Sequence, residues 1–276
     1  MMKKNKALLI ISIVFFVIGI GTIFYPTISQ NYNQKIADNE IDKFKKQMQE
    51  IQKTTESKES GDKNKGEKEE QKPSEESEQS SKVEFNYSKE QLDRLFVDMQ
   101  KYNEKIYKEG QIGITDPFEK ESPSIDLSGY QIYNNLIGFI EAPTIDMSLP
   151  MYLGANDYNM SLGAAHLSNT SLPIGGENTN AVFAGHTAYI GRQLFDKIVY
   201  LKQGDDVNVT NFWGTLKYKV VDARIIYPNE TENILIQEGK DLITLTTCYP
   251  YGRNTQRYIV ICERVKDQKA ENNNKE

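Results

Sequence analysis

Residues 242–262 read LITLTTCYPYGRNTQRYIVIC and hold two runs of strand-forming residues separated by a turn. The first run, residues 242–246, leads into Cys248, and the second, residues 258–262, is rich in Ile and Val. A Pro and a Gly break the chain between the runs, which is typical of a loop joining two neighbouring strands. We therefore expect the Cys248 thiol to lie at the rim of a sheet.

Similar short runs, separated by turn residues, recur along the chain from Tyr130 onward. The other runs cover residues 137–140, 151–153, 181–184, 206–210, 216–221 and 223–227. Little helix is expected between them, apart from one short candidate at residues 193–200. This pattern predicts a mostly β domain over residues 130–266, built as an eight-stranded closed or nearly closed β-barrel.

Composition narrows the classes of function. The net charge of -6 and the pI near 5.3 argue against a nucleic-acid-binding protein. The chain has only two cysteines and two histidines, too few for the four ligands of a typical structural zinc site. We expect no metal, no cofactor and no disulfide, since Cys248 lies in a setting that suggests catalysis.

The N-terminus predicts a membrane anchor. Residues 1–6 carry three lysines, and residues 7–25 carry no charge. At about 1.5 Å per residue, this uncharged helix would nearly cross a hydrocarbon core of roughly 30 Å. The positive-inside rule places residues 1–6 in the cytoplasm and everything after Pro26 outside the cell.

The segments between the anchor and the barrel differ in character. Residues 26–52 have apolar residues at helical spacing and predict a helical stalk. Residues 53–82 contain no Val, Ile, Leu, Met or aromatic residue, so we expect a disordered charged linker. Residues 83–129 should hold a helix that starts with a capping box of Ser88 and Gln91, followed by a lid segment. Residues 267–276 form a polar tail, so only one anchor is expected.

Three side chains are candidates for catalysis together with the Cys248 thiol: one arginine and two histidines, of which only one histidine is needed. Arg257 lies nine residues after Cys248, so a hairpin would bring its guanidinium beside the thiol. Such a group lowers a thiol pKa and stabilises an oxyanion. His186 ends the run 181–184 in a polar loop and could move protons, with His166 as its competitor. A lone Arg or loop His is usually only a surface residue, and Cys262 fits inert core packing.

Three of these motifs together resemble the sortase family of cysteine transpeptidases. Residues 244–248, TLTTC, resemble the TLxTC signature, and Arg257 lies where the family has its second-strand Arg. Residues 163–186 are similar to the segment that leads to the sortase His, which assigns that role to His186. The resemblance covers roughly residues 130–265.

Asp116, Pro117 and Phe118 resemble the lid motif of class C, the sortases that polymerise pilins. That resemblance implies that Asp116 pairs with Arg257 and that Phe118 covers Cys248; an ordinary Asp-Pro turn is the alternative. Two features depart from class C. The sequence carries no second apolar span near its end, and Thr187 follows His186 where the class usually has Arg.

The resemblance implies cleavage of an LPxTG-like sorting signal between Thr and Gly through a Cys248 thioester. His186 would protonate the leaving amine, and Arg257 would stabilise the oxyanion. A pilin Lys or a peptidoglycan precursor would supply the acceptor amine, and Thr247 and His166 could position substrate. We expect a monomer on the extracellular side of the membrane.

Three alternatives stay open. The first is a housekeeping or other wall-anchoring sortase. The second is an L,D-transpeptidase or papain-like peptidase, which the sequence around Cys248 does not match. The third is a non-catalytic wall-binding β-domain, which would leave the Cys, His and Arg unexplained.

Overall fold

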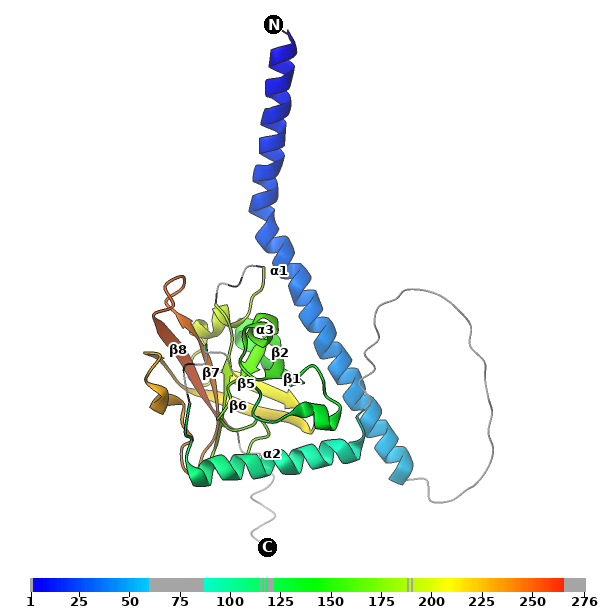
Figure 1. Cartoon of the computed structure of the whole chain (residues 1–276), viewed down its shortest axis with the longest axis vertical. Helices are drawn as coiled ribbons and strands as arrows, with labels where there is room; N and C mark the ends of the chain where they lie inside the picture. Colours follow the sequence, from blue (N-terminus) through cyan, green and yellow to red (C-terminus); the bar gives the residue numbers. More distant parts are fainter. Residues whose placement is uncertain are drawn as a thin grey trace, which may run out of the picture.

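The structure, a computed structural model, describes residues 2–59, 87–114, 116, 118, 122–187, 189 and 191–265. A β-barrel forms the body of the protein, a long N-terminal helix runs past one side of it, and a second helix crosses below it (Figure 1). Most of the predicted linker, the whole predicted tail and Pro117 lie outside the described residues.

The N-terminal helix α1 spans Met2–Glu59 and holds both the predicted anchor and the predicted stalk. Its span Leu9–Lys53 includes a stretch with a mean hydropathy of 2.4, none of it buried, so by length and composition it could cross a membrane. Pro26 lies inside the helix, and α1 bends between its dark-blue upper part and the part beside the barrel (Figure 1). A bend is expected there, because Pro lacks the N–H donor and its ring crowds the preceding turn.

The lower half of α1 packs on the barrel instead of standing free as a stalk. Ile41 and Phe44 are almost fully buried, and Phe44 lies 5.2 Å from the ring of Phe212 and 6.2 Å from that of Phe139. The helix also continues to Glu59, so the linker does not begin at residue 53 as predicted. The apolar spacing over residues 26–52 indicates a helix with one apolar face, but the surface that covers this face comes from distant strands and cannot be read from local sequence.

Helix α2, Lys89–Glu109, begins with the predicted capping box. The hydroxyl of Ser88 accepts from the Gln91 amide, and the Gln91 side chain accepts from the Ser88 amide. Its buried face includes Leu92, Leu95 and Met99, which pack into the main core. The helix therefore lies against the barrel by one face, as its apolar spacing indicates.

Eight strands close the barrel in the order β1-β2-β3-β4-β7-β8-β6-β5, which confirms the predicted fold class. The strands are β1 Leu136–Ala142, β2 Met147–Leu153, β3 Ala164–His166, β4 Thr179–Ala184, β5 Asp206–Asn211, β6 Gly214–Ile226, β7 Asp241–Tyr249 and β8 Gln256–Arg264. The short helices are α3 Asp157–Leu162, η1 Leu127–Tyr130, η2 Pro143–Ile145, η3 Phe195–Tyr200 and η4 Thr231–Ile234.

Two strands differ from the prediction. The runs 216–221 and 223–227 form one strand, β6, whose register shifts between Val220 and Asp222 where it pairs with β8. A bulge interrupts the alternation of side chains, which explains why the sequence pattern breaks there. Strand β3 was not predicted, because three residues are too few to show a period.

The pairing of three central strands brings their ends to one edge of the barrel. Strand β4 runs parallel to β7, and β8 runs antiparallel to β7. The carboxyl ends of β4 and β7 and the amino end of β8 therefore meet at the same edge. The strands also supply the core, where Phe183, Leu245 and Val260 are completely buried.

Candidate active site

Cys248 and Arg257 face each other across the last rungs of β7 and β8. The antiparallel register pairs Cys248 directly with Arg257, one residue from the end of each strand. Side chains of directly opposed residues project to the same face of a sheet, with Cβ atoms about 5 Å apart. The hairpin therefore places the guanidinium beside the thiol, at the rim that the sequence indicates.

His186 reaches the same edge from β4. The last parallel rung pairs Ala184 with Thr246, and the Gly185 amide donates to the Thr246 carbonyl at 3.2 Å. His186 and Cys248 each lie two residues beyond that last pair, so the same parallel direction places them side by side. The structure thus brings together a thiol, an imidazole and a guanidinium from three neighbouring strands.

Hydroxyl groups below the site join the His186 strand end to the Cys248 strand. Thr247 donates from Oγ1 to the Gly185 carbonyl at 2.7 Å. The Thr187 hydroxyl lies 2.5 Å from that of Thr247 and donates to the Cys248 carbonyl at 3.2 Å. Thr247 has no exposed surface, and its hydroxyl joins the Gly185 carbonyl to the Thr187 hydroxyl. The substrate-positioning role expected for Thr247 stays a prediction.

His166 lies in the interior and away from this chemistry. Its side chain is fully buried, and its Nε2 lies 2.8 Å from the Ser171 carbonyl and 3.2 Å from the Thr170 hydroxyl. Burial lowers the pKa of His166 to about 4, so the ring is neutral at pH 7. The predicted substrate-positioning role of His166 is therefore at odds with the structure, which leaves His186 as the histidine at the rim.

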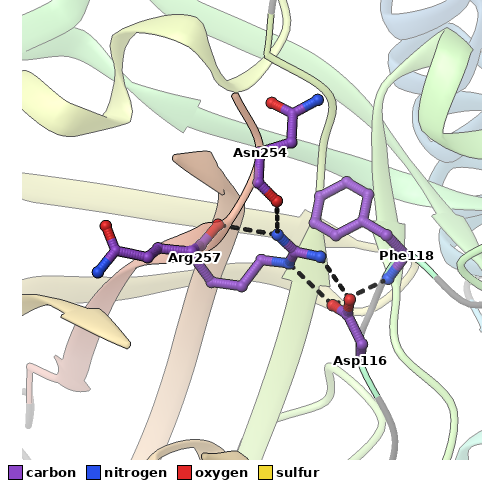
Figure 2. A network of polar contacts seen from close by, with 5 residues as sticks. Asp116, Phe118, Asn254 and Arg257 are labelled. Atoms are coloured by element: carbon purple, nitrogen blue, oxygen red, sulfur yellow. Dashed lines mark hydrogen bonds and ion pairs between the residues drawn. The ribbon is translucent and has the colours of Figure 1, made fainter. Parts of the chain in front are cut away.

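Asp116 and Phe118 cover the site from the segment between α2 and the barrel. Asp116 holds Arg257 through two bonds, from Nε at 2.9 Å and from Nη2 (Figure 2). The guanidinium carbon lies 4.9 Å from the centre of the Phe118 ring, and that ring lies 5.8 Å from the ring of His186. The Asp116–Arg257 pair is the contact that the class C resemblance implies, whereas the Phe118 ring lies against Arg257 and His186, and its expected position over Cys248 stays a prediction.

Known proteins share this arrangement of sequence and fold. The family model "Sortase domain" matches residues 140–265. Sortase D of Bacillus subtilis is 30% identical over 131 residues, which are 46% of this chain and 63% of that protein, somewhat under two thirds of its length. Matches to solved structures cover a larger share of the matched protein.

The matches to two solved sortase C structures extend over most of the length of those proteins. The Clostridium perfringens sortase C solved with a cell wall sorting motif is 33% identical, with a TM-score of 0.57, over 66% of this chain and 93% of that one. The Streptococcus pneumoniae sortase C is 31% identical, with a TM-score of 0.59, over 65% of this chain and 91% of that one. This chain belongs to the sortase family.

The sortase rests with its thiol and imidazole both biased toward their neutral forms. Burial raises the pKa of the Cys248 thiol; Arg257 opposes this rise and the Asp116 carboxylate adds to it. Burial lowers the pKa of His186, and Asp157 offsets part of that effect. With both groups neutral at pH 7, little thiolate is available while Asp116 and Phe118 cover the site.

Arg257 is held in place by more than the lid. Its Nη1 donates to the carbonyls of Asn254 at 3.0 Å and Gln256 at 2.8 Å (Figure 2). Burial disfavours its charge, but hydrogen bonding to Asp116 and the charge interactions with Cys248 and Asp116 together outweigh burial and raise the pKa of the guanidinium. The backbone contacts fix the position of Arg257 independently of Asp116, so it should stay beside Cys248 when the lid leaves.

Three site residues were missed from the sequence. Tyr189 stacks on His186 with ring centres 5.4 Å apart and an angle of 17°. Thr187 bonds to β7, and the Asn254 carbonyl orients Arg257. Thr187 and Tyr189 lie within three residues of His186, and this closeness is the one sequence feature that could have identified them. The contact of the Asn254 carbonyl with Arg257 depends on the shape of the loop, which the sequence does not specify.

The two cysteines and the other groups that could bind a metal lie apart from one another in the described part of the chain. Within the described ranges, no three His, Cys, Asp or Glu side chains gather closely enough to hold an ion. Both Cys248 and Cys262 are free thiols, and Cys262 is completely buried in the core.

Replacing Thr247 with Val should lower the free energy of unfolding by about 1–3 kcal/mol, because the buried Gly185 carbonyl loses its donor. Thr247→Ser keeps the hydroxyl and should lose less. Thr246 offers a matched control, since its buried hydroxyl has no hydrogen-bond partner among the described residues. Urea denaturation compares the three variants, and equal losses for Thr247→Val and Thr246→Val would contradict the proposed hydrogen-bond role.

Proposed function

We propose that this sortase is a cysteine transpeptidase that cleaves an LPxTG-like sorting signal between Thr and Gly and transfers the acyl group to an amine. The observation that carries the proposal is the meeting of Cys248, His186 and Arg257 at one barrel edge. A wall-binding domain without catalysis has no need for a thiol, an imidazole and a guanidinium at one place.

The chemistry follows from the positions of these groups. His186 takes the proton of Cys248 as substrate binds, and the thiolate sulfur adds to the Thr carbonyl carbon. Arg257 stabilises the resulting oxyanion. The C–N bond then breaks, His186 returns the proton to the leaving Gly amine, and a thioester remains on Cys248. An acceptor amine attacks the thioester and loses a proton to His186, the C–S bond breaks, and His186 passes that proton to the released Cys248 sulfur.

The acceptor is proposed to be a pilin Lys. Solved relatives are described as pilus-related sortase C, and the Streptococcus pneumoniae structure as informative on pilin substrate specificity. The contact of Asp116 with Arg257 agrees with class C. The second candidate acceptor is a peptidoglycan precursor; the chain also matches proteins named sortase D and sortase A.

The apolar half of α1 supports a single membrane anchor, with residues 1–6 in the cytoplasm and the barrel outside the cell. Its side chains point outward without burial, as Phe15 and Ile23 illustrate with exposures of 69% and 72%. Lipid would cover such a surface. The enzyme is proposed to act there as a monomer, without a cofactor.

The direct test is to trap the thioester. The full chain is incubated with an LPxTG-type peptide without acceptor, and the intact mass and the digested peptides are measured. We expect the acyl group on Cys248, with Cys262 unmodified as the internal control. Acylation of neither cysteine at high peptide concentration would reject the proposed function. Adding a Lys-bearing pilin peptide or a wall-type amino peptide then distinguishes the two acceptors.

A further inference from the structure

The described loop residues that follow His186, namely 187, 189 and 191–195, contact His186 and one another through their backbones and rings. The Phe195 amide donates to the His186 carbonyl at 3.1 Å, and the Arg192 amide donates to the Tyr189 carbonyl at 3.1 Å. Tyr189, on the same loop, stacks on the His186 ring. The position of this loop therefore affects the position of the imidazole.

Helix α1 holds the far side of this loop. Asn33 donates from Nδ2 to the Gly191 carbonyl at 2.6 Å, across 158 residues of sequence. Gly191 has a φ of +73°, and a Cβ built there would lie 2.0 Å from the Ser29 hydroxyl. Gly is favoured at this position, because another residue would be strained in the left-handed conformation and its Cβ would clash with the Ser29 side chain.

We propose that Asn33 is a positioning residue for catalysis: it binds Gly191, and through the loop it keeps Tyr189 stacked on His186 beside Cys248. Asn33 touches no reacting atom, so its effect passes entirely through the loop. The catalytic consequence rests on the function proposed above, whereas the effect on the His186 ring does not.

This contact links the proposed membrane anchor to the active site. Asn33 lies eight residues after Tyr25, the last residue of the proposed membrane-spanning segment 7–25, which is about 12 Å along a helix. Through Asn33 and Gly191, α1 sets the catalytic loop at a fixed short distance from the end of that segment. A helix that ended at the membrane and continued as a free stalk would leave the loop without this support.

The test compares variants of the full chain in detergent. Asn33→Ala removes the donor, and Asn33→Asp removes it while keeping the size of the side chain. Gly191→Ala disturbs the same contact from the loop side. Asn31→Ala is the matched control, because Asn31 is exposed on the same helix two residues away.

Ring titration by NMR is clear because the chain has only two histidines. Loss of the contact should move the pKa of His186 up toward its ordinary value of about 6.5, as solvent reaches the ring. The pKa of His166, in the core, should stay near 4 and so reports an intact fold. The titratable and charged groups near His186, namely Cys248, Arg257 with Asp116, and Asp157, are unchanged in all variants.

Peptide cleavage provides the second readout. We expect kcat to fall about tenfold or more with KM unchanged, since a displaced general acid weakens chemistry and not binding. If the His186 titration and kcat of Asn33→Asp match those of Asn31→Ala, the proposal is wrong. If His186 responds but no variant or parent cleaves peptide, the positioning role holds and the proposed function fails. If Gly191→Ala does not fold, the two Asn33 variants still decide.

Discussion

Replacing Arg257 with Ala is expected to lower kcat for peptide cleavage by about 10²–10³-fold, the usual cost of removing one donor to an oxyanion. Arg257 faces Cys248 across the β7–β8 hairpin, and its Nη1 is fixed by the Asn254 and Gln256 carbonyls. The donor is therefore in place before substrate binds. Arg257→Lys keeps the charge but loses the planar fork of donors, so a partial loss is expected.

The same substitution also frees Asp116, which complicates the measurement. Cleavage should therefore be compared in an Asp116→Ala background, where the Asp116–Arg257 contact is absent in both variants. Arg253→Ala is the matched control, because Arg253 is exposed in the same β7–β8 loop. Equal kcat for the Arg257→Ala and Arg253→Ala chains would show that Arg257 does not act on the transition state.

Much of the site follows from local sequence. Residues 242–262 predict two strands joined by a short loop, and that loop length makes Cys248 and Arg257 neighbours without any knowledge of the rest of the barrel. The capping box of Ser88 and Gln91 is equally local. Motifs that depend on a few adjacent residues are visible in sequence, because chain geometry alone brings their members together.

The features that escaped prediction depend on distant parts of the chain. The bond between Asn33 and Gly191 spans 158 residues, and neither residue belongs to a recognisable motif. The complete burial of Thr247, which precedes the nucleophile, was not predicted either. Burial at the end of a strand depends on the neighbouring strand and loop, which a single sequence does not specify.

Replacing Asp116 should raise the reactivity of Cys248, whereas replacing Arg257 should lower activity, although the two residues form one ion pair. In the covered state, burial and the Asp116 carboxylate both raise the pKa of Cys248, and Asp116 occupies the guanidinium. Removing the carboxylate therefore lowers the thiol pKa and frees Arg257 for the oxyanion. The thiolate fraction at pH 7 should rise, because each unit by which the pKa falls gives about ten times more thiolate.

Asp116→Asn and Phe118→Ala are each expected to speed alkylation of Cys248 by iodoacetamide at pH 7, by about tenfold for a fall of one unit in the thiol pKa. Asn keeps the size of Asp and removes only its charge, whereas Phe118→Ala uncovers the guanidinium and the His186 ring. The midpoint of the alkylation rate against pH should move down in both variants. Asp93→Asn, an exposed position on α2, is the charge-matched control. A rate and midpoint in Asp116→Asn equal to those of Asp93→Asn would mean that the carboxylate does not restrain the thiol, and Asp116 would then serve only to anchor its own segment on the barrel.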